Sequence, residues 1–85
     1  MGQAPRNKPK RLAEKLLQIR EALGLSQKEM AERLANQTGF KITHKQISNY
    51  EHDRGEPFLE TTLAYARLAS VEMNDIADDE LDLNL

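Results

Sequence analysis

Two short segments of this 85-residue chain begin with the same helix-starting pattern. Ser26 is followed three positions later by Glu29, and Thr43 is followed three positions later by Gln46. In such a capping box the first hydroxyl accepts a hydrogen bond from a backbone N–H inside the helix, and the later side chain accepts one from the capping residue. The pattern therefore predicts that one helix begins just after Ser26 and another just after Thr43.

An apolar residue stands before each of the two caps. Leu25 can pack on Met30, and Ile42 can pack on Ile47, and this hydrophobic staple fixes the direction from which the chain enters a helix. Two short helices held at a defined angle indicate a helix-turn-helix unit.

Apolar residues at helical spacing predict three further helices. The first starts near Pro9 and ends at Gly24, since glycine readily adopts the left-handed conformation that stops a helix. Another covers residues 59–71, and a last one begins at Met73. The expected fold is all-α, a compact five-helix domain with a hydrophobic core.

Charge divides the chain into parts although its net charge is only −2. Residues 1–20 carry six basic side chains and one acidic one, whereas residues 70–85 carry six acidic side chains and no basic one. We expect a flexible basic arm over residues 1–8, a helical domain over residues 9–77 and an acidic tail over residues 78–85. The tail either frays or packs against a partner subunit. The local electrostatic fields of such separated basic and acidic segments govern binding more than the net charge of the chain does.

Several classes of protein are disfavoured by the sequence. The chain has no cysteine, so it has neither a disulfide nor a thiolate metal site. No apolar run approaches the ~20 residues of a membrane span, and no secretory leader is recognisable. His44 and His52 are not at a spacing that suggests metal binding or catalysis. We expect a cytoplasmic protein that is not an enzyme, with no catalytic residue, metal or cofactor and no membrane partner.

Eight residues match, in order, the pattern of one known family: Arg20, Gln27, Ala31, Ile47, Ser48, Tyr50, Glu51 and Pro57. From Leu12 to Ile76 the chain thus resembles the phage-repressor-like (XRE/Cro-type) helix-turn-helix family. The resemblance implies a repressor-like fold that binds double-stranded DNA and regulates transcription. In that family the first motif helix lies across the DNA backbone, and the second enters the major groove.

The turn between the two motif helices is longer than in a minimal member of that family. Ala31 and Ile47 are sixteen positions apart, which is about six more than the minimal motif needs. We expect residues 35–38 to extend the first motif helix by about a turn. Gly39 should end that helix, and Phe40 should tuck beneath the lengthened turn.

The resemblance also indicates which residues meet DNA. Those expected at base edges are His44, Lys45, Gln46 and Asn49. Lysine can donate to O6 and N7 of guanine, and asparagine can make a paired contact with N6 and N7 of adenine, whereas the base preferred by His44 stays open. Those expected at phosphates are Lys10, Arg11, Gln27, Lys41, Thr43, Ser48 and Arg54. For Lys41 the alternative is a surface position on a tolerated insertion.

Arg20 and Glu51 are expected to play a structural part. Their positions in the family commonly form an ion pair that joins the first helix to the end of the recognition helix. Arginine can engage a carboxylate through two parallel hydrogen bonds.

Partners and mechanism follow from the small size of a single recognition helix. It reads only a few base pairs, so we expect a homodimer on an inverted repeat, with half-sites ~34 Å apart or a multiple of that. Repression of transcription is the expected outcome. The alternative is an antitoxin-type interaction module that neutralises a basic partner protein through its acidic tail and regulates its own operon.

Overall fold

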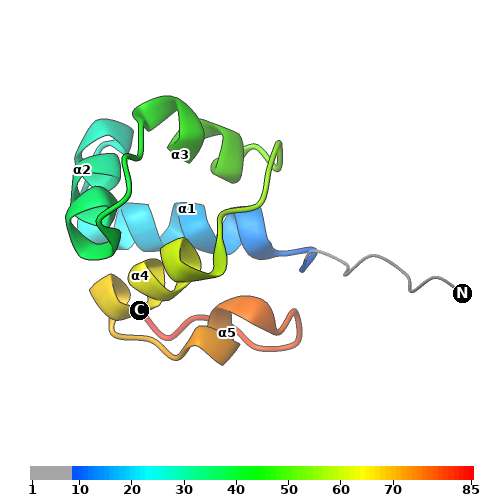
Figure 1. The fold of residues 1–85 in the computed structure, drawn as a ribbon. Coiled ribbons are helices and arrows are strands. Elements are labelled where there is room, and N and C mark those ends of the chain that lie inside the picture. Colours follow the sequence, from blue (N-terminus) through cyan, green and yellow to red (C-terminus); the bar gives the residue numbers. More distant parts are fainter. Residues whose placement is uncertain (1–8) are drawn as a thin grey trace, which may run out of the picture.

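The computed structural model describes residues 9–85, and these residues form five helices and no strand (Figure 1). The helices are α1 (Leu12–Leu23), α2 (Gln27–Thr38), α3 (His44–Glu51), α4 (Leu59–Ala69) and α5 (Met73–Ala77). The all-α, five-helix prediction is therefore confirmed. The basic arm expected over residues 1–8 lies outside the described residues.

α2 begins and ends where its sequence indicates. The Ser26 hydroxyl accepts a hydrogen bond from the Glu29 N–H at 3.0 Å, and the Glu29 carboxylate accepts one from the Ser26 N–H at 2.8 Å. The helix continues to Thr38 and stops at Gly39, which has a φ of 81°. The inserted residues thus lengthen α2, as predicted, and the left-handed glycine turns the chain toward α3.

α3 starts at the second capping box, with 2.9 Å between the Thr43 N–H nitrogen and the Gln46 carboxamide oxygen. The turn before it differs from the prediction at Phe40. This side chain remains 41% exposed and meets the ring of Phe58 edge-on, with 6.4 Å between the ring centres. The Thr38 hydroxyl accepts from the Phe40 N–H at 3.0 Å, which holds the turn against the end of α2. Phe40 therefore packs sideways on an aromatic neighbour instead of beneath the turn.

The core lies around α1, which contacts α3, α4 and α5, while α2 packs on α3 and α4. Fully buried apolar and aromatic side chains come from every helix: Leu16, Ile19, Met30, Leu34, Ile47, Tyr65 and Ile76. Figure 1 shows α3 and α5 on opposite sides of α1. The two motif helices are thus held on one side of the domain, and the C-terminal part of the chain covers the other.

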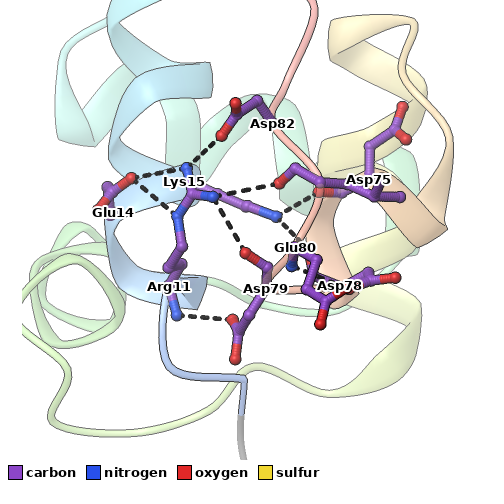
Figure 2. A network of polar contacts seen from close by, with 9 residues as sticks. Arg11, Glu14, Lys15, Asp75, Asp78, Asp79, Glu80 and Asp82 are labelled. Atoms are coloured by element: carbon purple, nitrogen blue, oxygen red, sulfur yellow. Dashed lines mark hydrogen bonds and ion pairs between the residues drawn. The ribbon is translucent and has the colours of Figure 1, made fainter.

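The acidic tail, residues 78–85, folds back onto the start of α1 in the same chain (Figure 2). The Asp79 carboxylate accepts hydrogen bonds from the backbone N–H groups of Lys10 and Arg11, both at 2.9 Å. Arg11 occupies the N-cap position of α1, and an arginine side chain has no atom that can accept such a bond. Asp79 therefore caps α1 from the far end of the sequence.

The guanidinium of Arg11 holds the tail from the other direction. It lies 2.8 Å from the Asp82 carboxylate and donates to the backbone oxygens of Asp79 at 3.1 Å and Leu81 at 3.3 Å. Leu83 packs against the core. The tail thus lies on its own α1 and is not a frayed end.

Lys15 completes this contact from within α1. Its side chain is 0% exposed, and its ammonium donates to the backbone oxygens of Asp75 at 2.6 Å and Asp78 at 2.7 Å. These oxygens lie at the C-terminal end of α5, where carbonyl groups lack helical partners and a positive charge is favoured. α1 and the C-terminal region therefore exchange caps, since Asp79 caps the start of α1 and Lys15 caps the end of α5.

Replacing Asp79 by alanine is expected to lower the melting temperature at about pH 7. The N–H groups of Arg11 and Lys10 hold the pKa of Asp79 below its usual value. A depressed pKa stabilises the fold at any pH above the unfolded-chain value of about 3.9, and that contribution is lost as the pH falls through the native pKa. The difference in melting temperature between the parent and Asp79→Ala should thus be full near neutrality and shrink below about pH 4.

Glu80→Ala serves as the control, because Glu80 is an exposed neighbouring carboxylate. Thermal melts of the three proteins across this pH range provide the measurement. A difference for Asp79→Ala that persists unchanged in acid would show that its charge does not cap α1.

Candidate nucleic-acid interface

α3 has one face anchored in the domain and an opposite face directed outward. Ile47 is 0% exposed, and the Glu51 side chain is only 3% exposed. Because successive residues of an α-helix are rotated by about 100°, Lys45 and Asn49 project from the face opposite these two. Lys45 is exposed and Asn49 is half-buried. The structure thus places these two predicted base contacts one helical turn apart on the outer face.

The first turn of α3 holds the other two predicted base contacts. His44 and Gln46 are both exposed. The carboxamide oxygen of Gln46 belongs to the cap with Thr43, which leaves its amide group to donate elsewhere. The Thr43 hydroxyl in turn accepts from the Gln46 N–H at 3.3 Å. Gln46 and Thr43 therefore fix the N-terminal end of α3, and the exposed side chains of His44 and Lys45 belong to this first turn.

A buried ion pair fixes the other end of α3. Arg20 donates through Nε to one Glu51 carboxylate oxygen at 2.6 Å and through Nη2 to the other at 3.0 Å. Its Nη1 donates to the Leu25 backbone oxygen at 3.0 Å. These bonds to Glu51 raise the pKa of Arg20. One guanidinium thus joins α1, the turn before α2 and the last residue of α3.

Gln27 also donates to Glu51, with 3.1 Å between its amide nitrogen and the carboxylate oxygen. The sequence indicated a phosphate contact for Gln27, and this link between α2 and α3 was missed. Gln27 and Glu51 are 24 positions apart, and no local pattern relates them. The Glu51 carboxylate therefore accepts three hydrogen bonds, two from Arg20 and one from Gln27. It thereby links α2 to α3.

Two predicted phosphate contacts lie at the C-terminal end of α3. Ser48 is half-buried, and its hydroxyl lies 3.3 Å from Nδ1 of His52, which also bonds to the Ser48 backbone oxygen at 2.7 Å. The Arg54 side chain is exposed, and its N–H donates to the Asn49 carbonyl at 2.8 Å. Asp53, with a φ of 58°, turns the chain between them. A hollow beside α3 is lined by Gln46, Asn49, Tyr50, Arg54, Gly55, Glu56 and Phe58.

The remaining predicted phosphate contacts lie elsewhere. Arg11 is held by the carboxylates of Glu14 at 3.1 Å and Asp82 at 2.8 Å, so the acidic tail neutralises it. Lys10 is exposed, but its backbone N–H belongs to the same cap. The tail lies with α5 on the side of α1 that faces away from α3 (Figures 1 and 2). The structure therefore does not bring Arg11 together with α3. Lys41, in contrast, is exposed on the turn that precedes α3.

A short helix with an anchored inner face and a polar outer face, preceded by a second short helix across a turn, defines a helix-turn-helix fold. A helix-turn-helix family model matches residues 16–76. The chain belongs to this XRE-type helix-turn-helix family, and it is a DNA-binding transcription regulator. Comparisons with curated proteins and with solved structures gave no match. Among residues 9–85, no helix has the length and apolar character needed to cross a membrane.

Proposed function

We propose that this chain is a sequence-specific repressor that reads the major groove with α3. One observation carries the proposal. Lys45 and Asn49 face outward from a helix whose opposite face is fixed by Ile47 and by the Glu51 network. The major groove admits an α-helix, and base reading requires side chains held on a rigid element.

The outer residues have distinct proposed roles. Lys45 donates to guanine, Asn49 makes the paired contact to adenine, and His44 reads a neighbouring base edge from the first turn. Thr43 and Arg54 lie at the two ends of α3, where they can meet phosphates of the flanking strand. Such phosphate contacts set position and orientation, and the base contacts set the sequence that is bound.

In this proposal the protein represses transcription by occupying a DNA site that RNA polymerase needs. Because α3 spans only eight residues, one copy reads a short half-site. We propose that two copies bind an inverted repeat, with their recognition helices ~34 Å apart or a multiple of that.

The antitoxin-type alternative rests on an acidic tail that is available to a basic protein partner. In the structure the carboxylates of Asp79 and Asp82 already bind the start of α1. A basic partner would have to displace Arg11 and uncap α1. We therefore favour the repressor role over the antitoxin role.

Selection of bound sequences from a random duplex pool tests the proposed function. The expected result is an inverted repeat with a few fixed positions in each half. Recovery of no shared sequence would contradict sequence-specific recognition.

Asn49→Ala should weaken binding to the selected duplex by ~1–3 kcal/mol and relax the preference at one base pair of each half-site. Its two amide hydrogen bonds can be matched by only one base edge. Arg54→Ala should instead weaken selected and scrambled duplexes by similar factors and lower the salt slope by about one phosphate contact.

Titrations of both duplexes at several salt concentrations separate the two effects. Each variant must melt at the parental temperature for the comparison to count. If Asn49→Ala keeps the full base preference and Arg54→Ala alters it, the assignment of α3 as the reading helix is wrong.

A further inference from the structure

His52 follows the last residue of α3, and its imidazole ring folds back onto the helix. Nδ1 of the ring lies 2.7 Å from the Ser48 backbone oxygen and 3.3 Å from the Ser48 hydroxyl. A carbonyl oxygen can only accept a hydrogen bond, so Nδ1 carries the proton of this contact. The same oxygen accepts from the His52 backbone N–H at 3.0 Å. The two bonds together hold the ring against the last turn of α3.

The other ring nitrogen, Nε2, is left for a partner outside the domain. The His52 side chain is exposed, and within residues 9–85 no hydrogen bond reaches Nε2. A neutral imidazole carries one proton, and because Nδ1 holds it here, Nε2 presents a lone pair. Uptake of a second proton at Nε2 turns that acceptor into a donor and gives the ring a positive charge.

We propose that DNA binding by this chain is coupled to protonation of His52, whose Nε2 then donates to a phosphate. The inference rests on the proposed function in one respect, because it requires the C-terminal end of α3 to lie beside the DNA backbone. His52 lies four positions after Ser48 and two before Arg54, and both of these are candidate phosphate contacts.

The coupling follows from what each form of the ring offers to a phosphate. The neutral ring turns a lone pair toward the phosphate oxygens, whereas the protonated ring gives them a charge-assisted hydrogen bond. DNA therefore binds the protonated form more tightly, and by reciprocity DNA raises the affinity of the ring for its second proton. A falling pH should thus strengthen the complex.

The other charged groups at this end of α3 belong to α3 itself, to the turn after it, and to the residues that meet Glu51 with their chain neighbours. They are Arg20, Glu21, Lys28, Glu51, Asp53 and Arg54. Carboxylates ordinarily change charge near about pH 4, and lysine and arginine above about pH 10, so histidine is the side chain that titrates between about pH 5.5 and 8. The chain has one other histidine, His44. Replacing each histidine in turn therefore assigns the pH dependence.

Binding of the full chain to a scrambled duplex, followed by fluorescence anisotropy, tests the coupling. The parent should bind about tenfold more tightly at about pH 5.5 than at about pH 8, the effect of one charge-assisted hydrogen bond. A scrambled duplex is used because a phosphate is alike at every step, so base contacts from His44 contribute little. The slope of log affinity against log salt should steepen by about 0.9 at the lower pH, since one more phosphate is contacted.

His52→Gln should bind with an affinity that changes less than about twofold over this range, because its amide donates but cannot take up a proton. Its salt slope should not depend on pH. His44→Gln is the matched control, since it removes the other histidine and should keep the parental pH dependence. Parental binding that does not depend on pH would overturn the proposal. So would a pH dependence that His52→Gln retains or that His44→Gln loses.

Nitrogen-15 NMR of the imidazole rings reads the protonation in the parent itself and needs no variant to fold. In the free protein at about pH 8 the His52 ring should carry its proton on Nδ1, and in the complex at about pH 5.5 it should carry a proton on both nitrogens. A free protein with the proton on Nε2, or a complex in which the ring stays neutral, would overturn the proposal.

The outcomes keep this proposal distinct from the proposed function. A pH effect that depends on His52, found in a protein that selects no shared sequence, would refute the proposed function and leave the coupling standing. Selection of an inverted repeat whose binding does not change with the protonation of His52 would refute the coupling alone.

Discussion

Replacing Arg20 by methionine, or Glu51 by leucine, is expected to destabilise the domain by about 3–5 kcal/mol, the usual result of breaking a buried ion pair. The Glu51 side chain is 3% exposed and that of Arg20 is 18% exposed, so the remaining charge cannot reach water freely. Loss of Arg20 also removes the bond to the Leu25 backbone. Either change should therefore loosen α3 against α1.

The double variant Arg20→Met/Glu51→Leu should recover much of this loss, because two apolar side chains fill the same space without a stranded charge. Urea denaturation of the four proteins gives the coupling free energy. Arg33→Met is the control, since Arg33 is an exposed arginine on α2. Strictly additive losses would mean that the two side chains do not interact.

Replacing Lys15 by methionine should destabilise the domain by about 2–3 kcal/mol, the range for hydrogen bonds made by a charged group. Methionine fills the space of the lysine stem but leaves the backbone oxygens of Asp75 and Asp78 without their donor. The tail should then detach more often than in the parent. Hydrogen exchange of residues 73–85 should accelerate more than exchange in α2.

Lys28→Met provides the comparison, because Lys28 is an exposed lysine on α2, and such a surface change usually stays within about 0.5 kcal/mol. Denaturation and hydrogen exchange on both variants check the assignment. Equal stability of Lys15→Met and Lys28→Met would show that water hydrogen-bonds to the backbone oxygens at the end of α5 as well as the Lys15 ammonium does.

Features encoded locally were predictable from the sequence. Both capping boxes and the stop at Gly39 depend on residues only a few positions apart, so their patterns stand out. The approach of Arg20 to Glu51 spans 31 positions, and it was expected from the family resemblance alone. Gln27 joins the same carboxylate, and nothing in the local sequence indicates that bond.

The contacts of the tail were missed for a similar reason, since they join residues 60 to 71 positions apart, from Lys15–Asp75 to Arg11–Asp82. One signal was present. Lys15 lies three positions after Leu12 and four before Ile19, and therefore on the apolar face of α1. A lysine on that face has to find acceptors inside the fold. Phe40 was misplaced because the position of its neighbour Phe58 depends on how α4 packs.

The cap that Asp79 provides for α1 also sets an order of events during synthesis. Its partners, Lys10 and Arg11, are synthesised before Asp79, which follows them by 69 and 68 positions. A contact between such distant positions closes a long loop. It forms late, because the chain loses conformational entropy on closing the loop before the contact can stabilise it. α1 is thus finished by a residue that is made only after α2, α3, α4 and α5. α1 therefore stays uncapped until Asp79 has been synthesised, and a chain that stops before Asp79 lacks this cap.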